Sequence, residues 1–388
     1  MLDKKFMPSF FLSVSFFLVT LSFSGEEVSD RADLIFFGGD ILTINEASPT
    51  AEAVAVRRGK ILAVGKKSDI LKWKGDKTEI IDLKGGTLLP GFIGFKPFSE
   101  QFEKDAKEVA TGYAKDGYTT ITDLSLEDAI DPLKEVAHSE NAPIRLQGYV
   151  VSDEMKNIAS LQKENDDRFR VLGVKIWADE TKLDPLVSEA RRLGLQISIR
   201  ANSGEEVERS IVALENVLQQ HPKDDHRFRI EHAEIANEQS LKKMISLKIA
   251  PSVTNQHLYC WGTGCKDRTD QVDVAGTAKK LGMKFTLSDA SPTTTISPLL
   301  MLEVVATRKA LGSGTFNQVN GISVEDAIKA MTLFAAEQTF RDKELGSIIA
   351  GKQADFVVLS QNPKDVEPRK IKDIEVQSTW INGKKVIL

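Results

Sequence analysis

Short apolar runs alternate with amphipathic segments through the middle of the chain, a pattern that predicts a parallel sheet covered by helices. Eight runs are typical of buried strands: 88–93, 119–123, 145–151, 174–178, 196–200, 228–232, 249–253 and 284–288. Helical periodicity lies between them, most clearly over 103–116, 185–193, 205–220 and 237–246. A (β/α)8 barrel and a doubly wound sheet both fit this alternation. Eight units, and no Gly-rich phosphate turn after any strand, favour the closed barrel.

Both ends of the chain show a different pattern, with short strands separated by glycine turns. Near the N-terminus the strand-like runs are 33–39, 51–57, 60–65 and 79–83. The last fifty residues repeat the pattern at 354–359, 376–381 and 385–388. We therefore expect one small β domain, built from 32–87 and 344–388, beside a barrel that spans 88–343.

The first 24 residues are typical of a secretory signal peptide. Two lysines precede an apolar run at 10–21, and the small residues Ser22 and Ser24 follow it. The run is short and serine-rich for a membrane span, although an uncleaved anchor has a similar pattern. We expect residues 1–24 to be removed and the mature protein to be exported, to the periplasm or outside the cell, without a membrane span.

Composition narrows the classes of function. The chain is 41% hydrophobic and 28% charged, with a formal net charge of -5 and no block of Lys and Arg, so disorder and nucleic-acid binding are both disfavoured. Only two cysteines, Cys260 and Cys265, are present, which excludes a disulfide scaffold and a four-cysteine zinc site. A local disulfide between them is the natural expectation for an exported protein, and a metal pair is the alternative. The expected partner is a small molecule; the oligomeric state is not readable.

Several polar residues follow the predicted barrel strands, where such barrels carry their chemistry. They are Asp123, Lys175, Asp179, Arg200, His232, His257 and Asp289. Imidazole nitrogen and carboxylate oxygen could together bind a metal that makes water nucleophilic. The alternatives are helix caps for the aspartates, an ion pair for Lys175 and a structural role for His232. His257 precedes an aromatic patch that could line a substrate pocket or pack a loop against the barrel.

Five longer segments carry a family resemblance. They are Leu-Pro-Gly-Phe-Ile at 89–93, Gly-Val-Lys-Ile-Trp-Ala-Asp at 173–179, Phe-Arg-Ile-Glu-His-Ala at 228–233, Ser-Asp-Ala-Ser-Pro at 288–292 and Gly-Ser-Ile-Ile-Ala-Gly-Lys-Gln-Ala-Asp-Phe at 346–356. Together they resemble the amidohydrolase superfamily, in its amidohydrolase-3 or YtcJ-like branch. The resemblance implies a metal-dependent hydrolase of non-peptide carbon–nitrogen bonds, with a (β/α)8 barrel joined to a small β-sandwich made from both chain ends.

The resemblance also implies site residues. Lys175 matches the family's often carboxylated lysine, His232 its sixth-strand histidine, and Asp289 its metal-binding aspartate and proton shuttle. The family's His-x-His pair after the first strand is replaced, since residues 91–98 read Gly-Phe-Ile-Gly-Phe-Lys-Pro-Phe, and Arg200 occupies the position of the fifth-strand histidine. The implied metal is a divalent ion, zinc in many members.

These departures leave two functions open. Catalytic zinc normally takes three protein ligands, and a guanidinium offers no lone pair, so only His232 and Asp289 remain as uncontested ligands. The chain is then either an impaired hydrolase, with His232 and Asp289 catalytic, or a silent protein that binds a small anion through Lys175 and Arg200. The short segments after the first and fourth strands indicate either evolutionary trimming of a retired enzyme or missing internal pieces.

Overall fold

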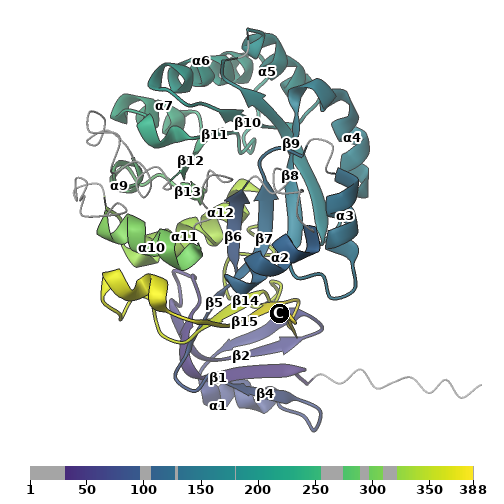
Figure 1. The fold of residues 1–388 in the computed structure, drawn as a ribbon, viewed down its shortest axis with the longest axis vertical. Coiled ribbons are helices and arrows are strands. Elements are labelled where there is room, and N and C mark those ends of the chain that lie inside the picture. Colours follow the sequence, from purple (N-terminus) through teal and green to yellow (C-terminus); the bar gives the residue numbers. More distant parts are fainter. Residues whose placement is uncertain are drawn as a thin grey trace, which may run out of the picture. The chain divides into compact units, whose positions relative to one another are not determined.

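The computed structural model describes residues 31–96, 106–126, 130–179, 181–254, 274–288, 297–308 and 321–387. The predicted signal peptide lies outside the described residues, as do His257, Cys260, Cys265 and Asp289. Within the described ranges, the strands form two sheets of eight strands each (Figure 1). No helix of these ranges is long and apolar enough to cross a lipid bilayer.

The first sheet is assembled from both ends of the chain, as the glycine-separated strands predicted. Its order is β16-β15-β14-β5-β1-β2-β3, and β4 also pairs with β1. The strands are β1 (Leu34–Leu42), β2 (Thr50–Arg57), β3 (Lys60–Gly65), β4 (Glu79–Asp82), β5 (Thr87–Pro90), β14 (Phe356–Leu359), β15 (Val376–Ile381) and β16 (Lys384–Lys385). We call this sheet and its short helix α1 (Lys67–Ile70) the composite domain.

The core of the composite domain joins the two chain ends. Phe36 on β1 packs edge-on against Phe356 and Trp380, with ring centroids 5.4 and 5.0 Å apart. The next residue, Ile35, belongs to a second buried cluster that includes Ile70 of α1. Because side chains alternate along a strand, β1 thus buries both of its faces, and apolar area from both chain ends stabilises the domain.

The second sheet is the predicted barrel. Its strands are β6 (Phe92–Lys96), β7 (Tyr118–Asp123), β8 (Arg145–Val151), β9 (Phe169–Trp177), β10 (Gln196–Arg200), β11 (Arg229–Glu231), β12 (Ala250–Thr254) and β13 (Thr286–Ser288). Neighbours pair in parallel from β6 to β13 in chain order, and β13 lies against β6. The parallel order confirms the prediction of a (β/α)8 barrel.

One predicted strand, 88–93, proves to be two. Residues 87–90 pair with β14 in the composite domain, whereas Phe92 begins the barrel. The chain passes from one sheet to the other at Gly91, where a Cβ atom would lie 2.2 Å from the side chain of Thr119. The apolar run is continuous because both strands are buried, so hydrophobicity alone could not reveal the break.

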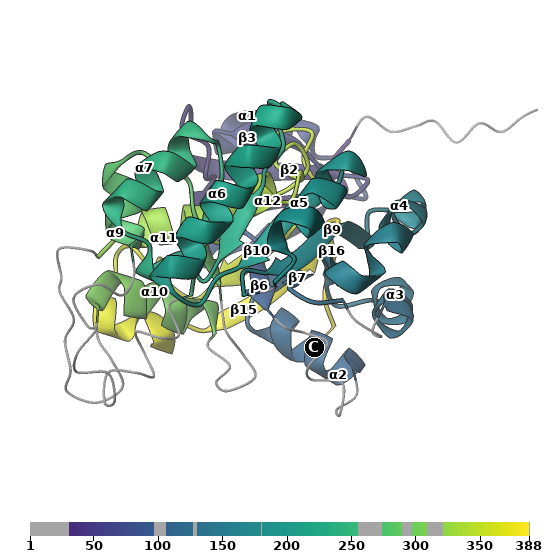
Figure 2. The ribbon, with the colours of Figure 1, turned by 90° about the horizontal axis from the view of Figure 1, so that it is seen from above.

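Helices cover the outside of the barrel, and Figure 2 shows α5, α6 and α7 in this position. The longest, α6, buries Val207, Ile211 and Leu214 at helical spacing, and the Ser203 side chain caps its start by accepting from the Glu206 N–H. The helices are α2 (Ala106–Lys115), α3 (Ile130–His138), α4 (Ile158–Leu161), α5 (Leu183–Arg192), α6 (Gly204–Gln220), α7 (Glu238–Ser246), α9 (Ala275–Lys280), α10 (Pro298–Thr307), α11 (Val324–Ala330) and α12 (Leu333–Gln338).

A buried polar network links the amino end of the barrel to the composite domain. Arg145, which begins β8 and is fully buried, donates to Asp355 at 3.1 Å and also to the side-chain oxygen of Asn382. Its other terminal nitrogen lies 3.2 Å from Asp167, which also accepts from Arg341 at 2.8 Å. Two arginines and two carboxylates thus hold the two sheets together.

Candidate functional site

Lys175, Arg200 and His232 lie at the carboxyl ends of three adjacent strands. Lys175 is on β9 and 4% exposed, half-buried Arg200 ends β10, and His232 follows β11 with 7% exposure. Ser198 pairs with Lys175, and Arg200 pairs with Trp177 on one side and with Glu231 on the other. Because residues two apart share a face of a strand, Lys175 and Arg200 lie on the same face of neighbouring strands. The fold therefore gathers three predicted site residues at one end of the barrel, which we call the mouth.

Below the mouth, the barrel interior contains a buried ion pair. The Arg229 guanidinium on β11 lies 3.8 Å from the centre of the Phe95 ring on β6, which places both side chains inside the barrel. Arg229 Nε is 3.7 Å from Glu231 Oε1, which also accepts a 2.6 Å hydrogen bond from Ser198. Burial raises the pKa of nearby Tyr149 to about 12, so the phenol stays protonated at neutral pH.

His232 has an unusual backbone conformation. Its φ of 59° and ψ of 36° are left-handed, which is uncommon for a residue other than glycine. Its Nδ1 lies 3.2 Å from Thr254 Oγ1, which in turn lies 3.0 Å from Ser288 Oγ. Strained backbone at a strand end is often found at functional sites, and here it accompanies a side chain held by a hydrogen bond.

The cations of the mouth contact an aromatic ring and an amide. The Lys175 ammonium lies 5.2 Å from the centre of the Trp177 ring, within the range of a cation–π contact. Arg200 Nε donates to Asn202 Oδ1 at 3.2 Å. Lys175 and Arg200 thus bring two positive charges to neighbouring strands, and Glu231 lies in register with Arg200 on the next strand.

Of the three predicted aspartates, the two among the described residues differ in their surroundings. Asp123 is buried at the end of β7, and its Oδ1 accepts a 2.8 Å hydrogen bond from the Ser125 N–H, so it serves the turn that follows the strand. Asp179 is exposed just after β9. The sequence alternative for Asp123 was a cap of the following helix, and the bond that the structure shows belongs instead to the turn directly after β7.

Three further features of the barrel were not singled out from the sequence. Lys96 ends β6, where the resemblance would place a histidine of the first-strand pair, and it is fully buried with its ammonium 4.9 Å from the Tyr118 ring centre. The others are the Arg229–Glu231 ion pair and the Thr254 hydroxyl beside His232. Strand alternation could have placed Arg229 and Glu231 on one face, since they stand two residues apart. No sequence signal connects Thr254 to His232.

The described side chains do not by themselves fit a catalytic metal. Within the described ranges, no group of three or more His, Cys, Asp and Glu side chains could hold a metal ion. His232 and a carboxylated Lys175 would supply two ligands, whereas catalytic zinc takes three from the protein. Arg200 supplies none, because a guanidinium has no lone pair to donate. Asp289 and His257, which could contribute, lie outside the described residues.

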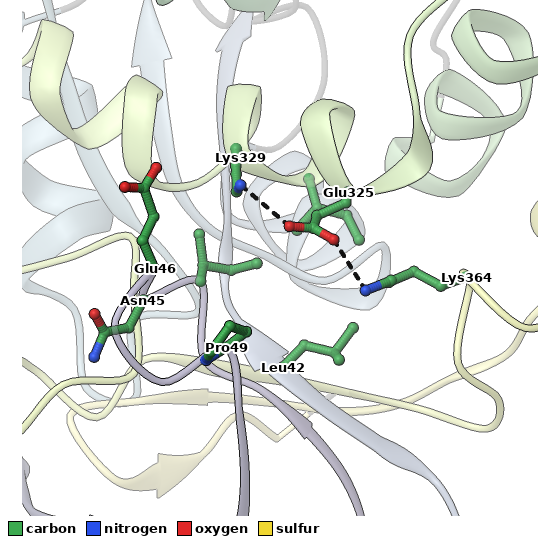
Figure 3. Close-up of a pocket in the computed structure, with 9 residues that line it drawn as sticks. Leu42, Asn45, Glu46, Pro49, Glu325, Lys329 and Lys364 are labelled. Carbon is green, nitrogen blue, oxygen red and sulfur yellow. Dashed lines mark hydrogen bonds and ion pairs between the residues drawn. The ribbon is translucent and has the colours of Figure 1, made fainter.

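Two hollows near the composite domain lie apart from the strand ends of the mouth. One, of 40 Å³, has an apolar floor that includes Leu42 and Pro49. At its rim Glu325 is held between Lys329 and Lys364 at 3.1 and 3.0 Å (Figure 3). The other, of 460 Å³, is lined by residues of 43–52, 64–66 and 348–350. The first has room for no more than a few water molecules, and neither is lined by a strand-end residue of the mouth.

Comparisons with known proteins identify the family of the chain. Residues 98–387 match the sequence profile of the Amidohydrolase family. The chain is 28% identical over 238 residues to YtcJ of Bacillus subtilis, covering 59% of this chain and 44% of YtcJ. It is 23% identical over 210 residues to the N-substituted formamide deformylase of Arthrobacter pascens, covering 53% of this chain and 39% of that protein. The chain thus spans less than half the length of these relatives.

A solved structure supports the fold. The crystal structure of an adenosine deaminase from Xanthomonas campestris with bound zinc superimposes with a TM-score of 0.70, at 15% sequence identity. The match covers 92% of this chain and 93% of that one. At this identity the likeness establishes the arrangement of barrel and composite domain, and it leaves the chemistry to the site residues.

Proposed function

Because this chain belongs to the amidohydrolase family, we propose that it is an impaired hydrolase of non-peptide carbon–nitrogen bonds in small molecules. The observation that carries the proposal is the position of His232, buried at the mouth and held through Nδ1 by Thr254. Among the described residues, His232 combines an unmodified side chain suited to metal binding or proton transfer with the place that the family resemblance assigns to it, whereas Lys175 would first need carboxylation.

The impairment follows from the groups that accompany His232. Lys96 and Arg200 stand where the family resemblance expects histidines, and both are cations without a lone pair when protonated. In the family, a bound divalent metal supplies nucleophilic water. Here Asp289 is the proposed proton acceptor, and His232 is the group expected to touch the reacting carbonyl or a weakly bound metal.

A second function is favoured by the charge of the mouth. Lys175 and Arg200 lie on the same face of adjacent strands, and two such cations suit a small carboxylate through charge-assisted hydrogen bonds. In that case the chain binds an anion and does not turn it over. In either case we expect the ligand to be a small molecule and the protein to be exported after removal of 1–24.

Metal content and turnover of the purified protein test the proposal. After incubation with zinc or manganese and removal of free ion, we expect less than one ion per chain. We also expect slow release of amine from a panel of N-substituted formamides. Both signals should disappear in His232→Ala and persist in His221→Ala, a control at an exposed histidine after α6.

The same protein distinguishes the two functions. Metal or turnover that His232→Ala retains would contradict the role given to His232, on which the proposal depends. Absence of metal and turnover, together with acetate or benzoate binding that is lost in Arg200→Ala, would establish the anion-binding protein instead. If the wild type neither binds metal, nor releases amine, nor binds a carboxylate, both functions are wrong.

A further inference from the structure

A buried histidine joins two turns at the amino end of the barrel. His226 lies between α6 and β11 and is 2% exposed. Its Nδ1 lies 2.9 Å from the Phe228 amide nitrogen, and its Nε2 lies 2.9 Å from the carbonyl oxygen of Leu247, directly after α7. The imidazole also packs against the Phe228 ring, with centroids 4.3 Å apart. His226 therefore connects the turn before β11 to the turn before β12.

These two contacts determine where the ring hydrogen of His226 lies. A backbone N–H can only donate, so Nδ1 accepts from Phe228 and carries a lone pair. A carbonyl oxygen can only accept, so Nε2 carries the hydrogen and donates to Leu247. Because both partners are backbone groups with fixed roles, His226 fits this place only as the neutral Nε2–H tautomer.

The backbone on both sides of the ring depends on the same contacts. Arg227, between the two residues that bond, has a left-handed φ of 48°. A side chain that accepts from the N–H two residues later stabilises a turn, as an asparagine does. On the other side, Leu247 ends α7, and its carbonyl is one of the last four of a helix, which have no partner within it. Loss of the neutral ring would thus weaken two turns at once.

The strand that follows is short and therefore sensitive to its starting point. β11 has only three residues, and it carries the buried Arg229–Glu231 ion pair before the chain reaches His232. Its start is fixed on one side by the bond from the Phe228 amide to His226. On the other side, the Phe228 carbonyl accepts from the Ala250 N–H of β12 at 2.8 Å. A change at the Phe228 amide thus acts one residue away from β11.

The surroundings of the ring disfavour its charged form. Burial, the largest effect, lowers the pKa of His226 from its ordinary value of 6.5. Lys223 and Lys248 lower it further, whereas the bonded carbonyl and Asp225 raise it without outweighing burial. Asp225 is also paired with Arg227 at 2.8 Å. Because the unfolded chain binds more protons at this residue, the stability from the neutral ring is complete above pH 6.5 and is lost as pH falls.

We propose that His226 is an acid-sensitive latch, which holds the start of β11 when the ring is neutral and releases it when the ring is protonated. Protonation places an N–H at Nδ1, opposite the Phe228 N–H, so two donors face each other where a hydrogen bond was. The bond from Nε2 to Leu247 can persist, so the release begins at Phe228. The latch does not depend on the proposed function, since it needs neither metal nor ligand.

Hydrogen exchange of the Phe228 amide tests the latch. The mature protein is exchanged at pH 7 and pH 4.5, and the rates are corrected for the intrinsic effect of pH. We expect the protection of Phe228 to fall at least tenfold at the lower pH, because the amide then lacks its acceptor. Nitrogen NMR of ¹⁵N-labelled histidine should show Nδ1 of His226 unprotonated at pH 7 and a titration midpoint below 6.5.

Matched variants separate titration from packing. His226→Asn places an oxygen near the position of Nδ1 that can accept from Phe228 but does not titrate, so protection should persist at both pH values. His226→Phe has no acceptor, so Phe228 should be poorly protected at both. His221→Asn, at an exposed histidine on the same connection, should follow the wild type. If His226→Phe does not fold, the wild-type titration and His226→Asn still decide the matter.

Three results would overturn the latch: Nδ1 of His226 protonated at pH 7, equal protection of Phe228 at the two pH values, or a fall at low pH that His226→Asn retains. Failure of the proposed function looks different. A protein that binds neither metal nor carboxylate but shows acid-dependent exchange at Phe228, abolished in His226→Asn, would disprove the function and keep the latch.

Discussion

The two ends of the barrel hold their charged side chains in different ways. At the amino end, Arg145 and Arg341 donate to carboxylates that belong to other segments of the chain, Asp355 and Asp167. At the mouth, Lys175 lies over an indole ring and Arg200 donates to the neighbouring Asn202. Charges that pair with distant segments stabilise a fold, whereas the mouth is the end at which barrels of this kind carry their chemistry.

The pKa values of the two amino-end carboxylates, Asp355 and Asp167, shift in opposite directions. Burial raises the pKa of Asp355, although Arg145 opposes the shift. Burial would also raise the pKa of Asp167, but Arg145, Asn382 and Arg341 together lower it. The same arginine thus serves two carboxyl groups in different surroundings, and removing it should affect both.

The largest expected effect is at Arg145. Arg145→Met keeps a long side chain but leaves Asp355 buried without its cation, and we expect a loss of about 3–5 kcal/mol in the free energy of unfolding. Arg200→Met makes the same change at the mouth, where the side chain is half-buried, and should cost less than about 1 kcal/mol. Urea unfolding followed by circular dichroism measures both. Equal losses would remove the contrast between the two ends.

A smaller effect is expected at Lys352, which precedes β14. The side chain is largely buried and donates to the Leu345 carbonyl at 2.9 Å, and burial lowers its pKa to about 8. Between pH 8 and its ordinary value the unfolded chain binds more protons than the folded one, so stability should rise with pH. The gain from pH 7 to pH 9 should be on the order of 1 kcal/mol.

Lys352→Met identifies the source of that gain. The variant should be more stable than wild type at pH 7 and should lack this part of the rise, as measured by urea midpoints at the two pH values. Lys343→Met, at an exposed lysine nearby, serves as the control and should follow the wild type. A rise that survives in Lys352→Met would show that other groups cause it.

The smallest effect concerns His138 at the end of α3. Its Nε2 lies 2.7 Å from Asp166, and this hydrogen bond raises the pKa of the imidazole. The stabilisation is therefore complete below pH 6.5 and is lost as pH rises through the folded-state pKa. Because both side chains are partly exposed, His138→Gln should change stability at pH 6 by only about 0.5 kcal/mol or less. Thermal unfolding at pH 6 and pH 8 should show the difference at the lower pH alone.

Prediction from the sequence succeeded where the signal is local. The alternation of apolar runs and helical segments indicated the barrel, and the glycine-separated strands at both ends indicated the composite domain. The one broken strand, at Gly91, shows the limit: two buried strands in a row have no polar position to mark the boundary. At the site, the motifs indicated Lys175, His232 and Arg200, but Lys96 attracted no attention, because a buried lysine cannot be told from an exposed one in sequence.

The sequence by itself determined that this chain builds an amidohydrolase barrel, that the first-strand His-x-His pair is replaced and that Arg200 stands where the family resemblance expects a histidine. Those facts depend on residue identity and on short-range periodicity, which the chain carries in any conformation. Only the tertiary structure decided which side chains meet. The bond between His232 and Thr254, the Arg229–Glu231 pair against Phe95, and the Arg145 network join residues on different strands and segments. Such contacts arise when the sheet closes, and their strength depends on the burial that closure creates.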